Sequence, residues 1–421
     1  MSKLKVLVVG ASIAGPTAAY WFAKAGASVT IIERFPKMRT NGQNIDIRTA
    51  GVTVMRKMPG MEAAVRAKTT QMEGISIVRD NGRPYGTIKA TGNPDQQSLV
   101  SEYEIFRGDL AQILFDLTKD NENIKYVFGE QVASMQQKEK DDGPITVEFA
   151  NGLLTSEYDL VVACDGATSR TRAIGLGCGV RDHIKPTNCW AASFSIKQDL
   201  LEGSKMAQSY SATGGRFSAI GPDPSGVNRV GLMGIHPRDD GDATLPFREA
   251  MKQGDDALKQ FVAQHYKGAG WKIDEVVKGM MEAGDFYANE IVQVKTLSLY
   301  KGCFVLVGDA GYAPSFTGTG TTLAMAGAYV LAGEVGRHKG NLAAGLRGYE
   351  EQMRPIIDDL QKIPPLIPTI FAPQTAWGIW LRNNIFAFIA WTRILEFAQK
   401  FFAGSFASTD KYGLPDYEWV A

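Results

Sequence analysis

The stretch of the chain up to Glu33 constrains the fold more than any other. A β-branched run at Leu4–Val9 is followed by a glycine-containing turn, by helical apolar spacing over Ile13–Ala25, and by a second β-branched run at Ser28–Ile32. Strand, helix and strand in this order predict a parallel βαβ unit, with the crossover helix on one face of the sheet. We therefore expect an α/β fold.

The turn after the first strand matches the dinucleotide-binding fingerprint with one departure, because Ser12 stands where the middle glycine is expected. That position requires a small residue, since the backbone approaches a pyrophosphate held by the amides and dipole of the helix N-terminus. Glu33, at the end of the second strand, would accept hydrogen bonds from ribose hydroxyls. The predicted nucleotide-binding residues here are Gly10, Ser12, Ile13, Ala14, Gly15, Glu33 and Arg34. The alternative is a tight turn without a ligand.

Composition limits the classes of partner. The chain has 421 residues, 44% of them hydrophobic, which is enough for two lobes. Lys plus Arg equal Asp plus Glu at 45 each, so the overall charge favours neither nucleic acid nor an anionic membrane. The four cysteines lie far from one another and from histidine, which predicts reduced thiols and no metal site. Met1 leads into the first strand without the apolar region of a signal peptide, so we expect a cytoplasmic protein.

The rest of the chain alternates between strand and helix patterns in separated segments. Strand patterns occur at Lys125–Phe128, Ile145–Phe149 and Leu160–Ala163, and a helix pattern covers Gly108–Lys119. From Cys189 to His236 longer alternating runs indicate an antiparallel sheet, which we expect to form a second lobe. Polar helices are expected between Phe247 and Val277.

Three further motifs open helices or follow buried strands. Arg107-Gly108-Asp109-Leu110 opens a helix, Asp165-Gly166-Ala167 follows the strand ending at Cys164, and Gly308-Asp309-Ala310-Gly311 leads to Pro314 and Gly318-Thr319-Gly320-Thr321-Thr322. Together with the N-terminal turn, this set and its order resemble the group A flavoprotein monooxygenases, the p-hydroxybenzoate hydroxylase-like family, and especially its tetracycline-inactivating branch. The resemblance spans roughly residues 4–350.

This resemblance implies a fold and a division of the chain. The expected fold is α/β, with a Rossmann-like FAD-binding domain of the glutathione reductase type, a β-sheet substrate domain and a C-terminal helix. The FAD-binding domain would comprise residues 1–75, 100–180 and 295–360, and the substrate domain residues 76–99 and 181–294, followed by a helical segment of residues 361–421. The β-rich domain would lay its sheet over the flavin face.

The resemblance also implies roles for individual residues. Glu33 and Arg34 would hold the adenosine ribose end, Arg107 the pyrophosphate or flavin edge, and Asp309 the ribityl chain. Amides at Gly318 and Gly320 would face the flavin N1/C2 side, where a helix N-terminus stabilises the anionic reduced flavin. The remaining expected cofactor-binding residues are Asp46 and Arg48 beside the isoalloxazine, and Val132, Asp165, Gly308, Thr321 and Thr322. The chain departs from the family at Tyr312, where many members carry His, and near Thr322, where Asn is common.

The chemistry implied by the resemblance belongs to the cofactor. NADPH or NADH, bound transiently, would reduce FAD; O2 would add at flavin C4a, and the hydroperoxide would oxygenate an electron-rich carbon of a small-molecule substrate. We assign no general base, because the four histidines are scattered. An FAD-dependent oxidase, epoxidase or cyclase, or a flavin-binding protein without turnover, are the alternatives. The sequence leaves the oligomeric state open.

The sequence leaves open the roles of three groups of residues: the pocket candidates, the charged residues after Cys164, and a C-terminal apolar helix. The pocket candidates are Arg48, Phe194, Tyr210, Phe217, Met233 and Pro314, although aromatic residues in strands also serve as core. Asp165 is either a site residue or a buried acid that orders a turn. Arg170 and Arg172 are either site residues or cations on a helix surface. A C-terminal helix from Trp377 to Phe402 is expected to pack against both lobes rather than to form an interfacial membrane or dimer helix.

Overall fold

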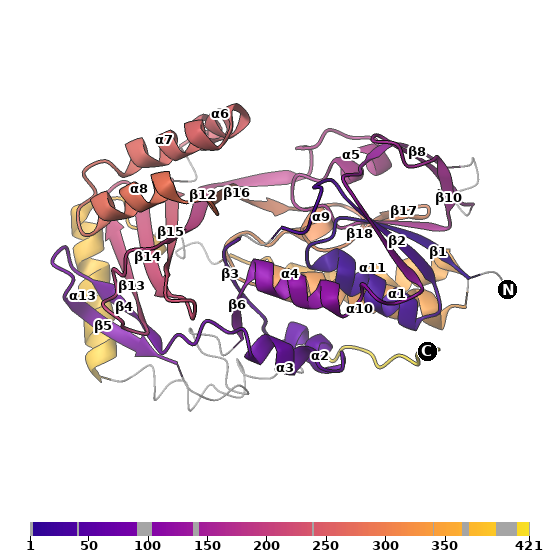
Figure 1. The fold of residues 1–421 in the computed structure, drawn as a ribbon, viewed down its shortest axis with the longest axis horizontal. Helices are drawn as coiled ribbons and strands as arrows, with labels where there is room; N and C mark the ends of the chain where they lie inside the picture. Colours follow the sequence, from indigo (N-terminus) through magenta and orange to yellow (C-terminus); the bar gives the residue numbers. More distant parts are fainter. Residues whose placement is uncertain are drawn as a thin grey trace.

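The computed structural model describes residues 3–39, 42–90, 103–137, 143–237, 240–339, 341–363, 370–392 and 411–420, and the statements below concern these residues. Two large sheets dominate the architecture (Figure 1). The first has six strands in the order β17-β18-β11-β1-β2-β7. Its strands are β1 (Lys5–Val9), β2 (Ser28–Glu33), β7 (Ile124–Phe128), β11 (Leu160–Ala163), β17 (Tyr300–Lys301) and β18 (Phe304–Leu306).

The predicted βαβ unit is confirmed. β1 pairs in parallel with β2, and α1 (Ala14–Lys24) forms the crossover between them. β1 pairs on its other side with β11, also in parallel, and β11 pairs with β18. All four of these strands are buried on both faces, which is why their sequences are almost continuously apolar.

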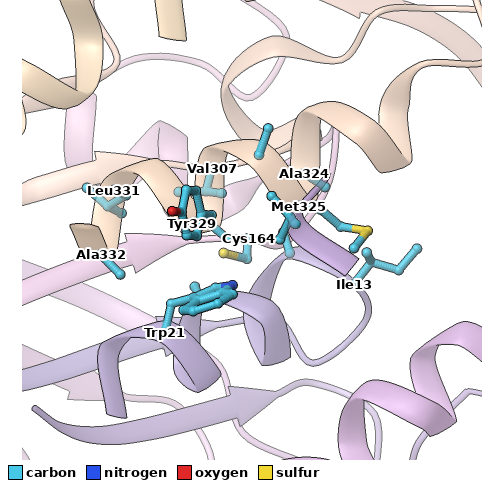
Figure 2. Packing of buried hydrophobic residues seen from close by; sticks show 14 of the residues in the cluster. Ile13, Trp21, Cys164, Val307, Ala324, Met325, Tyr329, Leu331 and Ala332 are labelled. Carbon is cyan, nitrogen blue, oxygen red and sulfur yellow. The ribbon is translucent and has the colours of Figure 1, made fainter. Parts of the chain in front are cut away.

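Alternate side chains of β1 enter two different cores. Val6 and Val8 pack with α1, α2 (Ala50–Arg56) and α10 (Gly320–Arg337) in the larger cluster, where Trp21 and Tyr329 also lie (Figure 2). Leu7 and Val9 point to the opposite face. That face is covered by a three-stranded sheet of β8 (Val132–Gln137), β9 (Ile145–Phe149) and β10 (Ser156–Tyr158). The six-stranded sheet is therefore a middle layer.

The second large sheet has seven strands in the order β16-β12-β15-β14-β13-β4-β5 and lies at the other end of the molecule (Figure 1). All neighbours are antiparallel except β13 and β4, which are parallel. Its strands are β4 (Gly74–Val78), β5 (Pro84–Lys89), β12 (Ile184–Ile196), β13 (Met206–Ala212), β14 (Arg216–Pro222), β15 (Asn228–Ile235) and β16 (Tyr287–Val294). The antiparallel sheet predicted from Cys189 onward is part of it.

Three helices cover one face of this sheet. They are α6 (Leu245–Gln253), α7 (Asp255–Tyr266) and α8 (Ile273–Glu282), in the region where polar helices were predicted. Trp190, Phe194 and Leu232 are buried between the sheet and these helices. The residues that alternate with them are half-buried, so the other face of the sheet remains partly open.

Short elements connect the two sheets. A two-stranded antiparallel ladder, β3 (Asn44–Asp46) with β6 (Glu104–Phe106), lies between them (Figure 1). The Arg229 guanidinium of β15 stacks on the Phe106 ring at 4.3 Å from its centroid. The other elements are α3 (Met61–Arg66), α4 (Arg107–Asp116), α5 (Arg170–Leu176), α9 (Asp309–Tyr312) and α11 (Leu342–Leu360).

The helix predicted near the C-terminus is present as α13 (Ala376–Thr392), and the predicted continuation to Phe402 lies outside the described residues. It packs on β5 and β13, and Arg382 donates to Ser211 Oγ at 2.9 Å. Several large apolar side chains of α13 remain exposed, with Trp391 81% accessible. None of the described helices combines the length and the apolar character that a bilayer span requires.

Residues 411–420, here called the C-terminal strap, return to the six-stranded sheet's helical layer (Figure 1). The Trp419 ring lies 4.7 Å from that of Trp21, and the Tyr417 hydroxyl donates to Glu334 Oε1 at 2.8 Å. The amide of Val420 donates to the Lys24 carbonyl at 3.0 Å. No sequence pattern predicted this strap.

Candidate active site

The glycine turn after β1 requires its two outer glycines. Gly10 has φ 107°, and a Cβ there would lie 2.6 Å from the carbonyl oxygen of Cys164, which follows β11. A Cβ on Gly15 would lie 1.9 Å from the Gly10 carbonyl oxygen. No side chain caps the N-terminus of α1, so its first amides can serve an anionic group. Ser12 is half-buried within this turn, whereas Ile13 and Ala14 are buried.

Glu33 ends β2 and faces the same turn. Its carboxylate accepts hydrogen bonds from the Ala11 amide at 3.0 Å and from the Phe35 amide at 3.1 Å. Each carboxylate oxygen keeps acceptor capacity beyond these bonds, which is what a ribose diol would use. Arg34 is exposed and stacks over the Phe35 ring at 4.8 Å. Glu33 therefore supports the turn as well as being available to a ligand.

Asp309 begins α9 directly after β18, beside the start of α1. A Cβ on Gly308 would lie 3.2 Å from the Ala14 Cβ, so Gly308 brings these two helices close together. The Asp309 side chain is exposed, yet desolvation by the surrounding protein raises its pKa, while the Arg107 guanidinium lowers it. We call the surroundings of this carboxyl, between the starts of α1, α9 and α10, the recess.

The start of α10 borders the same recess. A Cβ on Gly320 would lie 3.6 Å from Asp309 Oδ1, and no side chain caps the N-terminus of α10. Gly318 has φ 75° and is exposed. Thr321 and Thr322 are buried. Free amides at this helix start can stabilise negative charge in the recess.

The segment after β3 is tied to α10. Thr322 Oγ1 donates to the Arg48 carbonyl at 2.9 Å and accepts from the Arg48 amide at 3.2 Å. The Arg48 guanidinium pairs with Asp46, with Nη2 2.8 Å from Oδ2. Arg107 lies against the residues just before β3, because a Cβ on Gly42 would be 3.1 Å from the Arg107 Cβ. The structure thus brings residues predicted from four distant motifs to one place.

Glu104 also belongs to this region, although the sequence analysis did not select it. Its strand partner across the β3–β6 ladder is Asp46. Burial, and then the Asp46 charge, raise the pKa of Glu104 to about 7. No local spacing could have identified Glu104, because its environment depends on a strand pairing between distant segments.

The turn after β11 mainly orders the start of the helix that follows it, α5. Asp165 accepts from the Thr171 amide at 3.1 Å and from its hydroxyl at 2.9 Å, so it orders the start of α5. The possibility that Arg172 is a surface cation is wrong: Arg172 is fully buried and donates to the Ala310 carbonyl at 2.8 Å. Arg170 is exposed. The Arg172 bond fixes the α5 region next to α9.

Val132, a predicted site residue, and Tyr312, a departure from the family pattern, both contribute packing. Val132 is 8% exposed and lies in the apolar cluster between β8 and the six-stranded sheet. Tyr312, which replaces the family's usual His, is buried, and its hydroxyl lies 3.0 Å from that of Tyr349. The Tyr349 hydroxyl in turn donates to the Leu306 carbonyl at 2.8 Å. A polar side chain at position 312 is thus satisfied within the core.

The pocket candidates separate onto the two faces of the seven-stranded sheet. Phe194 is buried on the helical face, and Tyr210 packs there too, donating to the Ala269 carbonyl at 3.0 Å. These two side chains therefore do not line the half-buried face. Phe217 and Met233 are cross-strand partners on the opposite, half-buried face. Pro314 lies in the chain between Asp309 and Gly318 and is buried. It forms an isolated antiparallel β-bridge with Gln293 of β16.

The edge strand β16 of this sheet lies beside the recess. The Val294 amide at the end of β16 donates to the Ala313 carbonyl at 3.0 Å, four residues after Asp309. Tyr287 at the other end of β16 stacks with Arg39 at 5.3 Å, and Arg39 is close enough to Arg107 for their charges to interact. In the part of the chain that the structure describes, no group of three or more His, Cys, Asp or Glu side chains is arranged to hold a metal ion.

Comparisons with known proteins agree with this geometry. Residues 3–360 match a family model described as FAD binding domain. The FAD-dependent monooxygenase asL4 of Sarocladium schorii is 33% identical, with 94% of each chain covered. Monooxygenase CTB7 of Cercospora beticola is 32% identical over 99% of this chain and 98% of its own. The chain belongs to the FAD-dependent monooxygenases.

Solved structures of this family share the fold. The tetracycline destructase Tet(51) has a TM-score of 0.76 at 27% identity, with 99% of this chain and 100% of its own covered. The Klebsiella pneumoniae HpxO structure complexed with FAD and uric acid has a TM-score of 0.70 at 19% identity, over 97% of this chain and 96% of its own. The expected α/β fold and the group A flavin monooxygenase family are thereby confirmed.

The residues of this monooxygenase fit its FAD. The glycine turn leaves no room for side chains, and the uncapped start of α1 offers amides where a pyrophosphate is expected. Arg107 supplies a cation and Asp309 a hydrogen-bond acceptor in the recess next to the uncapped start of α10. Phosphate, sugar hydroxyls and an anionic ring system are the groups that such a donor set accommodates.

Proposed function

We propose that this monooxygenase uses NADPH or NADH and O2 to insert one oxygen atom into a small aromatic, phenolic or polyketide-like substrate. One observation carries the proposal: the Val294 amide at the end of β16 bonds to the Ala313 carbonyl just after α9, so the seven-stranded sheet, with its half-buried face, meets the recess that contains Asp309 and the start of α10. A substrate on that face would lie against a flavin in the recess. The similarity to a tetracycline destructase supports a polycyclic, phenol-bearing substrate class.

The roles proposed for the cofactor-binding residues follow from their positions. Glu33 holds the adenosine ribose, the first amides of α1 hold the pyrophosphate, and Asp309 binds the ribityl hydroxyls. Arg107 balances negative charge between these groups. The dipole at the start of α10 stabilises the flavin when it is reduced and anionic. When bound, FAD would supply the redox chemistry between the nicotinamide and O2.

The proposed substrate face combines small residues with bulky apolar ones. Ala191, Ser193 and Gly231 leave open space along β12 and β15, and they alternate with residues buried under the helices. Phe217 and Met233 border this space, and the Phe217 ring lies 4.7 Å from that of Phe371. Such a surface would hold an apolar ring system by contact area while a few hydroxyls set its orientation. The chain thus positions the substrate and excludes water.

Isotopically labelled O2 tests the reaction. We would screen NADPH and NADH consumption against a library of phenols, and then follow the label in the product and peroxide in solution. Oxidation of the nicotinamide should be slow alone and faster with the correct substrate, and the product should gain one labelled oxygen atom. Stoichiometric peroxide with unlabelled product for every accepted compound would identify an oxidase instead.

A further inference from the structure

The β3–β6 ladder places two carboxyl groups beside one arginine. Asp46 and Glu104 are directly opposed in the antiparallel register, so their side chains lie on the same face. Asn44, two residues before Asp46, donates from Nδ2 to Glu104 Oε1 at 2.7 Å. Asp46 Oδ2 accepts from Arg48 Nε at 3.1 Å and from Nη2 at 2.8 Å. One guanidinium therefore faces two acids.

The backbone of Arg48 cannot move independently of the recess. Both its amide and its carbonyl are bonded to Thr322 Oγ1 in the first turn of α10. Gly51 packs against the same threonine, because a Cβ there would lie 3.1 Å from the Thr322 Cα. The guanidinium, by contrast, is oriented by Asp46. Any change in the charge around Asp46 therefore changes the electrostatic force on the Arg48 guanidinium at the edge of the recess.

The described groups around Glu104 favour a proton on it. Its desolvation and the opposed Asp46 disfavour the charged form, whereas Asn44, Arg48 and Thr70 favour it. The first two effects outweigh the others, which is why the pKa of Glu104 rises to about 7. Two like charges on directly opposed residues of a ladder also destabilise the ladder.

We propose that Glu104 is a positioning residue that carries a proton below neutral pH, so that Arg48 then stays paired with Asp46 at the edge of the FAD site. When Glu104 loses this proton, a second carboxylate competes for the guanidinium and draws it toward β6. This inference rests on the proposed location of FAD in the recess. The consequence is a flavin environment that changes with pH near neutrality.

The first test is a pH titration of the visible absorption spectrum of FAD bound to the holoenzyme. The native protein should show one spectral transition near the pKa of Glu104, about 7. Glu104→Gln should remove the transition and keep the spectrum that the native protein shows at low pH. Asp46→Asn should shift the transition to lower pH, because the opposing charge is lost. Glu73→Gln, which removes the same charge at an exposed position, should leave the transition in place.

A second measurement needs no flavin and separates this inference from the proposed function. Because the folded-state pKa of Glu104 is raised from 4.5 to about 7, the native protein should lose stability relative to Glu104→Gln as pH rises through that window. The ratio of their unfolding constants should change by about 100-fold in denaturant titrations. A flat ratio, or a flavin transition that survives in Glu104→Gln, would overturn the inference. Failure to bind FAD while the ratio changes would overturn the proposed flavin site alone.

Discussion

The C-terminal strap should contribute measurably to the stability of the six-stranded sheet and its helices. Trp419 is half-buried and packs against Trp21 and against Tyr329, whose ring centroid lies 5.8 Å away. Full burial of a tryptophan is worth about 3–5 kcal/mol in a Trp→Ala comparison, so half-burial here corresponds to about 2 kcal/mol. We expect Trp419→Ala to raise the unfolding constant of this region by roughly 30-fold.

Urea unfolding followed by circular dichroism measures the effect without relying on tryptophan emission. Trp391→Ala is a matched control, because the Trp391 side chain is 81% exposed on α13 and its removal should cost almost nothing. The urea midpoint should fall for Trp419→Ala and stay unchanged for Trp391→Ala. Equal midpoints for the two variants would refute the idea that the strap is a structural part of the FAD-binding region.

Four other expectations concern the cofactor and the substrate face. Asp309→Ala should weaken FAD binding by about 1–3 kcal/mol, measured by flavin fluorescence titration, whereas His183→Ala should not. Gly15→Ala should abolish FAD loading, seen as lost flavin absorbance, because its Cβ would lie 1.9 Å from the Gly10 carbonyl oxygen. Met233→Trp should raise KM about tenfold while FAD occupancy stays constant. Denaturation should release free FAD, and flavin retained on the precipitated chain would contradict non-covalent binding.

Local patterns predicted those parts of the fold that local chemistry decides. The βαβ unit followed from β-branched runs and from glycines whose extra Cβ atoms would clash with backbone, as at Gly10 and Gly15. The strand at Leu160–Ala163 was predicted with its observed bounds, because it is uniformly apolar between polar turns. At such positions, the residue and its immediate neighbours in the sequence are enough to predict the local backbone structure.

Contacts between distant segments could not be predicted in this way. Glu104 acquires its environment from a ladder with β3, and Arg172 becomes buried because it bonds to the Ala310 carbonyl. Tyr210 and Phe217 lie in adjacent strands with similar patterns, and only the strand register shows that they face opposite sides of the sheet. Pairing partners, register and helix coverage are properties of the assembled fold.

The strand order of the six-stranded sheet has a consequence for synthesis on the ribosome. β1 is made first, but its neighbour β11 begins at residue 160, and the next strand, β18, begins at residue 304. The growing chain therefore holds an unpaired edge on β11 while five strands of the seven-stranded sheet, β12 to β16, are translated. Such an edge invites mispairing with other nascent chains. We expect that slowing translation between β11 and β18 would lower the yield of native protein, whereas slowing it after α11 would not.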